Sequence, residues 1–183
     1  MAGNTRFDYI CRMIRIEQVS RPDRSEARRL LACLGERYPG GLDWLERRLD
    51  DVEADRAQIW RAALGATAVG YAIASPKGRR RTKLSTIYVA PRARGFGVGR
   101  GLLANVARDW WAREVEQAFV TVDEGDHATR SFLAANGYAS LPDGRRAYGD
   151  RFDVAYAAWP ELLGAPELPG AIDPPYPAAA HPN

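Results

Sequence analysis

The stretch that decides the fold is STIYVAPRARGFGVGRGLL, residues 85–103. Its beginning belongs to a β-branched segment, residues 84–89, that predicts a strand. Pro91 ends that strand, because proline has no amide hydrogen to donate. A loop with three glycines follows at residues 94–99. Apolar residues at helical spacing come directly behind the loop, namely Leu102, Leu103, Val106 and Trp110.

This succession of strand, glycine loop and helix has the physical properties of a pyrophosphate site. Glycines at 95, 97 and 99 let the backbone approach a ligand without a Cβ in the way. Amides at a helix start favour anions, and Arg92, Arg94 and Arg100 add positive charge. A Walker A loop would need a Lys after its last glycine, and a dinucleotide fingerprint would need the spacing GxGxxG. Neither pattern is present, so the loop predicts an anion site of another type.

The segments on either side of this stretch alternate between strand and helix patterns. Alternating or β-branched apolar residues predict strands at 13–19, 57–64, 68–75, 118–122 and 151–158. Asp23 and Glu26 have the spacing of a capping box, and apolar residues behind them predict one helix up to Gly40. Two further helices are expected, over about 42–52 and from about 126 to 137. This order indicates an α/β fold with a mixed sheet.

The composition is that of an ordinary globular protein. Of 183 residues, 46% are hydrophobic and 27% are charged, which excludes a disordered chain, a coiled coil and a collagen. No run approaches the roughly 18 apolar residues that a membrane span needs, and residues 1–10 show no signal-like stretch. Cys11 and Cys33 are too few for a disulfide framework, so free thiols are expected. We therefore expect a cytoplasmic protein without membrane contact, either a monomer or a homodimer.

The chain divides at about residue 160 into a basic body and a proline-rich tail. Seven of residues 160–183 are proline, which excludes a regular helix or a central strand there. All 26 Lys and Arg residues precede this point, whereas Glu161, Glu167 and Asp173 follow it. We expect a single domain over residues 1–159, basic enough to favour a phosphate-bearing ligand. We expect a flexible tail over residues 160–183.

Two motifs carry a resemblance to a known family. Arg94-Gly95-Phe96-Gly97-Val98-Gly99 resembles the acyl-CoA loop, Q/R-x-x-G-x-G/A, of the GNAT N-acetyltransferase superfamily. HATRSFLAANGY, residues 127–138, resembles the late helix of that family, which often ends in (N/K)-x-G-(F/Y). The element order is also similar, so the resemblance covers about residues 13–159. It implies a GNAT-like acyl-CoA-binding fold, α/β, with a mixed central sheet flanked by helices.

The resemblance assigns residues to acetyl-CoA, a co-substrate, and implies no metal. Backbone groups of Ile87, Tyr88 and Val89 would hold the acetyl carbonyl and the pantetheine at the edge of a splayed strand. Asp126 stands where the family often has an Asn that contacts CoA. The pyrophosphate would be held by the loop, whose residues are Arg94, Gly95, Phe96, Gly97, Val98, Gly99 and Arg100.

The catalytic positions of the family match this chain less well. Where the family often has a Tyr that protonates the leaving thiolate, this chain has Leu133. Where some members have a Glu base, it has Thr121. Asp123, near the end of a strand, and Tyr138 are the replacement candidates for proton transfer. Glu124 and His127 are further candidates, and for these two and Asp123 the alternative is a solvated loop residue. Tyr148 is a further possible acid.

The resemblance implies an N-acetyltransferase that moves an acetyl group from acetyl-CoA to a primary amine by direct attack in a ternary complex. The acceptor would be a small molecule, a peptide or an aminoacyl-tRNA, and Tyr38 and Trp44 would line its pocket. The basic turn from Lys77 to Lys83 would bind an acidic acceptor or a nucleic acid, unless it is a solvated hairpin tip. Because the usual Tyr and Glu are missing, a non-catalytic acyl-CoA-binding or regulatory module is the alternative function.

A chain that ends at Trp159 is expected to unfold cooperatively near the temperature of the full-length chain. The tail offers no periodic apolar face, so its removal should expose no core. Thermal unfolding followed by circular dichroism measures the difference. A large loss of stability would mean that the tail packs on the body.

Overall fold

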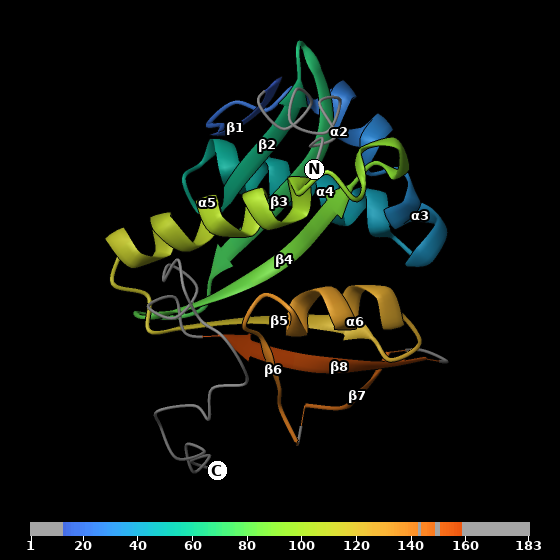
Figure 1. Ribbon diagram of the computed structural model, residues 1–183, viewed down its shortest axis with the longest axis vertical. Helices are drawn as coiled ribbons and strands as arrows, with labels where there is room; N and C mark the ends of the chain where they lie inside the picture. Colours follow the sequence, from blue (N-terminus) through green and yellow to red (C-terminus); the bar gives the residue numbers. More distant parts are fainter. Residues whose placement is uncertain (1–12, 143, 149–150, 159–183) are drawn as a thin grey trace, which may run out of the picture.

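The computed structural model describes residues 13–142, 144–148 and 151–158, which form one mixed sheet with helices on both faces (Figure 1). The strand order is β1-β2-β3-β4-β5-β8-β6, and β7 pairs with β8. Among these strands only β4 and β5 run parallel. The strands are β1 (Ile14–Gln18), β2 (Gln58–Leu64), β3 (Thr67–Pro76), β4 (Arg81–Val89), β5 (Gln117–Asp123), β6 (Ala139–Ser140), β7 (Arg146–Tyr148) and β8 (Arg151–Ala158).

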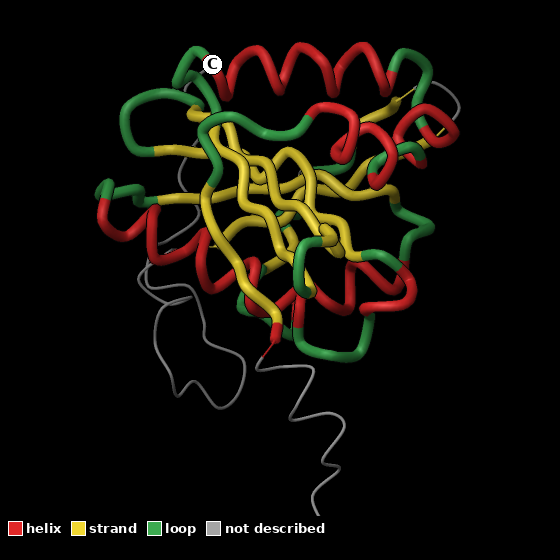
Figure 2. Tube along the Cα trace, turned by 90° about the horizontal axis from the view of Figure 1, so that it is seen from above, coloured by secondary structure: helices red, strands yellow, loops and turns green. Residues whose placement is uncertain are grey.

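Helices enclose the sheet from both sides, as the view from above shows (Figure 2). The predicted α/β fold, with a mixed central sheet flanked by helices, is therefore confirmed. In chain order the helices are α2 (Arg24–Leu30), α3 (Cys33–Arg37), α4 (Gly41–Glu53), the short 3-10 turn η1 (Pro91–Ala93), α5 (Val98–Ala112) and α6 (His127–Ala134).

Two apolar cores hold the layers together. On one face of the sheet, α5 buries Leu102, Val106 and Trp110, and α6 buries Leu133 in the same cluster. On the other face, α2 and α4 pack a second cluster against β2 and β3, with Leu45 and Leu49 fully buried. Both helical stripes follow the apolar spacing that the sequence predicts.

The N-terminal helical region differs from the prediction of a single helix up to Gly40. The chain forms α2 and α3 instead, and they are separated at Leu31, which ends α2 and is fully buried. Asp23 caps α2 as predicted, by accepting a hydrogen bond from the Glu26 amide at 2.9 Å. The predicted capping box is not closed, however, because the Glu26 carboxylate bonds to β2 and β3.

The hairpin between β3 and β4 is tighter than predicted. β3 continues to Pro76 and β4 begins at Arg81, so the turn shrinks to residues 77–80. The Lys77 amide closes the turn by donating to the Arg81 carbonyl at 2.8 Å. Cys33 is a free thiol. Cys11 and the tail after residue 158 lie outside the described residues, so the division near residue 160 stays a prediction.

The Glu26 carboxylate ties α2 to the sheet. It accepts two hydrogen bonds from the Arg61 guanidinium, at 2.7 and 2.9 Å. It also accepts from the Ala68 amide at 2.9 Å and from the Tyr71 hydroxyl at 2.8 Å. The Arg61 guanidinium outweighs the effect of burial and lowers the pKa of Glu26 to about 2. The charged form of Glu26 is therefore part of the folded state.

Glu26→Gln is expected to destabilise the fold by about 3 kcal/mol at neutral pH, because Arg61 loses the partner of a half-buried charge. The folded pKa of Glu26 lies below its unfolded value, so this contribution is complete above about pH 5. It is lost as the pH falls toward the folded pKa of about 2. Urea unfolding at several pH values should therefore show a difference between wild type and variant that shrinks below about pH 5.

The matched control is Glu17→Gln, which removes a more distant, exposed partner of the same guanidinium at 3.8 Å. It should cost less than about 0.5 kcal/mol. Equal losses in the two variants at neutral pH would contradict the anchoring role of Glu26.

Candidate active site

The site originates where β4 and β5 diverge. The two strands pair only between residues 81–83 of β4 and residues 117–119 of β5. Farther along β4, Leu84 and Thr86 pair with β3 while Ser85 is left out of the register, which is a β-bulge. Figure 1 shows the two strands separating beyond this point. The edge of β4 that faces β5 is therefore open up to Val89.

The open edge of β4 presents backbone groups at alternate residues. The Ala90 amide donates to the Val69 carbonyl at 2.8 Å, one residue beyond the Val89–Gly70 pair. Since hydrogen-bonded and non-hydrogen-bonded pairs alternate in an antiparallel ladder, the backbone groups of Tyr88 point to β3. Those of Ile87 and Val89 point to the gap. Of the three predicted backbone donors, two thus face the opening.

Two of the three glycines in the loop behind β4 leave open space, as the sequence predicts, and the third does not. Gly95 and Gly97 have φ of +81° and +76°, and nothing lies within 4 Å of the place a Cβ would occupy. Gly97 caps α5 without a side-chain hydrogen bond, and the first amides of a helix have no partner in the helix itself. Gly99 allows α5 to pack closely against α6, because the ring of Phe132 in α6 lies 3.0 Å from the place that a Cβ would occupy.

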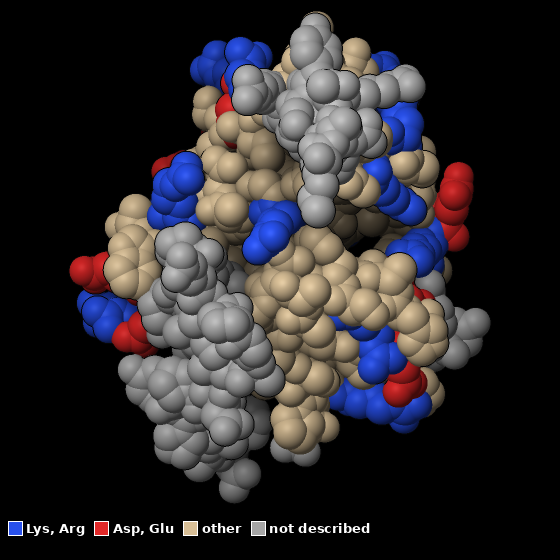
Figure 3. Space-filling view, viewed as in Figure 1, with Lys and Arg blue, Asp and Glu red and all other residues tan. Residues whose placement is uncertain are grey.

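Positive charge surrounds the loop. Arg92, Arg94 and Arg100 are all exposed. The Arg94 Nε donates to the Val89 carbonyl at 3.0 Å, which ties the loop to the end of β4. Lys and Arg side chains also lie around the hollow between the two halves of the molecule, on the face that carries α5 and α6 (Figure 3). The loop and its surroundings therefore form an anion-attracting concavity at one end of the open strand edge.

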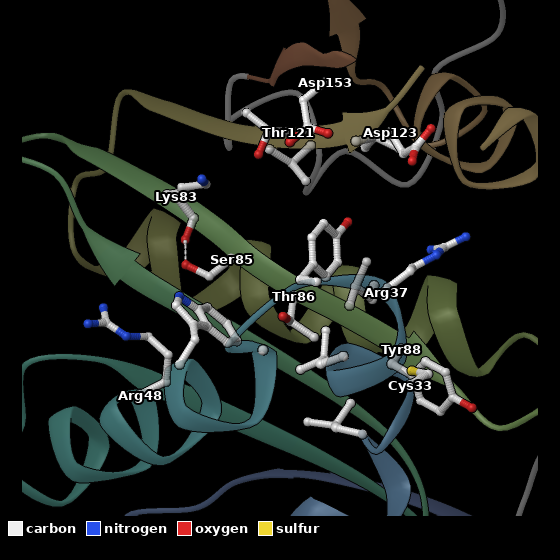
Figure 4. A pocket seen from close by; sticks show the side chains of 18 of the residues that line it. Cys33, Arg37, Arg48, Lys83, Ser85, Thr86, Tyr88, Thr121, Asp123 and Asp153 are labelled. Atoms are coloured by element: carbon white, nitrogen blue, oxygen red, sulfur yellow. Dashed lines mark hydrogen bonds between the residues drawn. The ribbon is translucent and has the colours of Figure 1, made fainter. Parts of the chain in front are cut away.

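A pocket of about 760 Å³ lies between the separated strands and the loop from α3 to α4. Tyr38 and Trp44 line it, and their contact with an acceptor stays a prediction. Its other walls come from β4, β5 and β8. Figure 4 shows Thr121, Asp123 and Asp153 on one side of the cavity, facing the residues of β4.

Two carboxylates lie side by side in this wall. Asp123 of β5 is directly opposite Asp153 of β8. The next pair along is hydrogen-bonded, since the Glu124 amide donates to the Phe152 carbonyl at 2.8 Å. Asp123 and Asp153 are therefore a non-hydrogen-bonded pair, whose side chains lie closest together, with Cα atoms about 4.5 Å apart. The pair makes this wall of the pocket acidic, and Asp123 also interacts electrostatically with Arg37.

Asp126 joins the two halves of the molecule at the mouth of the pocket. Its side chain accepts from the Thr129 amide at 3.0 Å, which caps α6, and from Arg37 of α3 at 3.0 Å. Burial opposes the charge, but the bonds from Thr129 and Arg37 hold the pKa of Asp126 below its usual range. The carboxylate thus has partners within the protein, and its predicted contact with CoA stays a prediction.

The other predicted proton-transfer residues lie outside the pocket. Tyr138 is only 3% exposed, burial raises its pKa, and its hydroxyl has no hydrogen-bond partner among the described residues. Glu124 pairs with Arg145, which lowers the pKa of Glu124. His127 is exposed at the start of α6. The side chain of Tyr148 lies outside the described part. Asp123 is therefore the predicted catalytic residue that reaches the pocket.

Sequence reasoning did not single out Asp153, Arg48 or Arg37 as site residues. Asp153 alternates with apolar neighbours in the last predicted strand, so its face was readable from the sequence. Its pairing with Asp123 was not, because the partner of a strand is a tertiary property.

No helix in the described ranges is long and apolar enough to cross a membrane. Within the same ranges, no group of three or more His, Cys, Asp or Glu residues is arranged to hold a metal ion.

Comparisons with known proteins agree with this geometry. The model of the acetyltransferase (GNAT) family matches residues 24–138, and no curated protein matches the chain. A GNAT-family protein from Desulfovibrio desulfuricans is 22% identical, with 80% of this chain and 99% of that chain covered and a TM-score of 0.72. An acetyltransferase from Streptococcus agalactiae is 16% identical, with 80% and 98% covered and a TM-score of 0.65.

The PaiA N-acetyltransferase from Thermoplasma acidophilum, solved in complex with coenzyme A, is 14% identical. In that comparison 78% of this chain and 97% of that chain are covered, with a TM-score of 0.62. At these identities the solved structures show the shared fold alone. The family model, in contrast, spans more than half of the sequence, and the chain therefore belongs to the acetyltransferase (GNAT) family.

Proposed function

We propose that this chain transfers an acetyl group from acetyl-CoA to a primary amine, by direct attack in a ternary complex. The observation that carries the proposal is the open edge of β4. It starts at a bulge, ends at the glycine loop and faces two carboxylates across the pocket. The family supports the same chemistry, and one structure of this fold was solved with coenzyme A.

The backbone of this chain would bind and polarise the thioester. The amides at the start of α5 would hold the pyrophosphate, and the pantetheine would follow the gap between β4 and β5. The Ile87 and Val89 amides would then donate to the acetyl carbonyl oxygen, where negative charge develops during attack. Because strand and helix fix these donors, they need no rearrangement when the charge appears.

The carboxylates would orient the amine and receive its proton. Asp123 and Asp153 would hold the incoming ammonium and accept one proton from it, directly or through a water molecule. The amine nitrogen then bonds to the acetyl carbon, and the carbon–sulfur bond breaks. The nitrogen gives up its second proton and the leaving thiolate takes up one, so the products are an N-acetylated amine, CoA and one released proton.

A non-catalytic acyl-CoA-binding module is the second candidate. The observation that favours it is Leu133, which occupies the family position of the proton-donating Tyr and is fully buried. Release of CoA in the presence of a panel of primary amines separates the two functions. Turnover above the rate of acetyl-CoA hydrolysis supports the transferase, whereas binding without turnover supports the module.

Gly97→Glu is expected to lower the affinity for acetyl-CoA at least about 100-fold, measured by titration calorimetry. The backbone there has a φ of +76° with open space beyond, so the new carboxylate would reach the expected pyrophosphate position. The matched control is Gly65→Glu in the β2–β3 turn, where φ is +61° and the space is equally open.

Both variants should lose about 1–2 kcal/mol of stability from the left-handed backbone, and only Gly97→Glu should lose binding. Equal acetyl-CoA affinity in the wild type and Gly97→Glu would contradict the assignment of the loop.

Asp123→Asn is expected to lower kcat about 100-fold while leaving acetyl-CoA affinity nearly unchanged, because it removes a proton acceptor and no cofactor contact. The asparagine oxygen can still accept the hydrogen bond that the Gly125 amide makes to Asp123 at 2.8 Å. The control is Glu124→Gln, one residue away and paired with Arg145. Tyr138→Phe should also leave kcat unchanged. Wild-type turnover in Asp123→Asn would remove Asp123 from the mechanism.

A further inference from the structure

Cationic side chains gather at the end of the pocket where β4 and β5 still pair. Lys83, the last paired residue of β4, lines the pocket, and so does Lys77 from the preceding turn. Arg47 and Arg48 approach from α4 on the other side. Two separate segments of the chain thus bring positive charge to one end of one cavity.

Two serine hydroxyls lie beside Arg48 at this end of the pocket. Ser75 of β3 lies directly opposite Lys83. The Ser75 hydroxyl accepts long hydrogen bonds from Arg48 at 3.4 Å and from the Ser85 hydroxyl at 3.5 Å. Figure 4 shows Lys83, Ser85 and Arg48 at this end of the pocket. Hydroxyl, ammonium and guanidinium groups together are the donors that carboxylates and phosphates bind.

Part of the positive charge at this end, on Arg47 and Lys77, is not neutralised by the residues that the structure describes. Arg48 pairs with Asp51 at 2.6 Å, yet its Nε is buried without a hydrogen-bond partner among the described residues. Neither Arg47 nor Lys77 makes an ion pair with the described residues. Asp43, one helical turn before Arg47, is the acid that lines the same end.

The pocket therefore carries basic residues at one end and acidic residues at the other. Asp123 and Asp153 lie in the opposite wall, at the far end of β5 from its pairing with β4. Along β4, Lys83 is four residues from Ile87, whose amide faces the gap, a separation of roughly 10–13 Å. The long side chain of Lys83 can shorten that distance by several ångströms.

We infer that the acceptor is a primary amine that also carries an anionic group, a carboxylate or a phosphate, roughly 7–13 Å from the amine. The amine meets Asp123 and Asp153 beside the thioester, and the anion meets Lys83, Arg48 and their neighbours. This inference rests on the proposed function, and it adds the substrate class.

The contacts of the basic residues near the β3–β4 turn favour a small acceptor over a nucleic acid. Arg80 forms ion pairs with Glu114 and Glu116, and Arg81 lies over the Phe119 ring at 5.6 Å from its centroid. Both cations thus have partners within the protein. Lys77 of the turn and Lys83 of β4 line the pocket instead, which favours a compact anion over an extended backbone.

Three amines of equal length test the inference, namely 6-aminohexanoate, 6-aminohexan-1-ol and 1,6-diaminohexane. The wild type should use 6-aminohexanoate with a kcat/KM at least about tenfold above that of the alcohol or the diamine. This preference should fall as ionic strength rises. Competition by inorganic phosphate and by acetate tells which anionic group binds more tightly. Equal use of the three amines, or a preference for the diamine, would overturn the inference.

Two variants and one control locate the anion site. Lys83→Met and Lys77→Gln should each bring the ratio of kcat/KM for acid over alcohol toward one. The control Arg79→Gln removes the same charge from the same turn, outside the pocket lining, and should keep the wild-type ratio. An unchanged ratio in both lysine variants would overturn the assignment.

Calorimetry without turnover separates this inference from the proposed function. Tighter binding of 6-aminohexanoate than of the alcohol, without CoA release from any amine, would refute the transferase and support the anion site. CoA release with equal binding of all three amines would support the transferase and refute the anion site. A short single-stranded RNA is also tested as a competitor. If it displaces 6-aminohexanoate more strongly than inorganic phosphate does, the acceptor is a nucleic acid and the inference of a small acceptor is overturned.

Discussion

The site depends on one constraint, which is that β4 and β5 pair over three residues and then separate. Unpaired backbone groups inside a sheet are unfavourable unless water or a ligand satisfies them. The bulge at Ser85 bends β4 away from β5 at this point. Gly70 allows β3 to follow the bend, since a Cβ there would lie 2.8 Å from the Tyr88 carbonyl. The open edge is thus built into the fold, and every binding role proposed for the backbone derives from it.

Contacts on both faces fix the width of the gap. On the α5 side, the core cluster that contains Leu102 of α5 also contains Val122 of β5 and Leu133 of α6. On the opposite side, Arg37 reaches across to Asp126 at 3.0 Å. The Glu26 anchor also holds α2 on β2 and β3. The separated strands are thus braced by contacts on both sides, which is the arrangement that a preorganised site needs.

Most of the fold and the shape of the loop at Gly95 and Gly97 could be predicted from the sequence, because they depend on local patterns. Strand and helix periodicity, the glycines at 95 and 97, and the Asp23 cap each act within a few residues. The walls of the pocket depend on pairings that no local pattern encodes. Asp153 faces the pocket because β8 pairs with β5, and Arg48 does so because α4 packs beside Ser75. For Tyr138 a local pattern was misleading. The motif that marks the late helix suggested a catalytic Tyr, but the Tyr138 ring lies in the core.

Replacement of the family Tyr by Leu133 is consistent with the chemistry of the proposed transfer. An alkyl ammonium has a pKa of about 10.4 and a thiol one of about 8.5 in water. At neutral pH the leaving thiolate therefore gains a proton from solvent spontaneously, whereas the amine must lose one before it can attack. Loss of that proton at pH 7 costs roughly 4–5 kcal/mol, and nearby carboxylates such as Asp123 and Asp153 raise this cost while they hold the ammonium. The step that needs help from the protein is thus deprotonation, which a carboxylate assists by relaying the proton through water. In the proposed transfer, acids beside the amine would therefore serve the more demanding proton transfer, and the thiolate would need no donor at the position of Leu133.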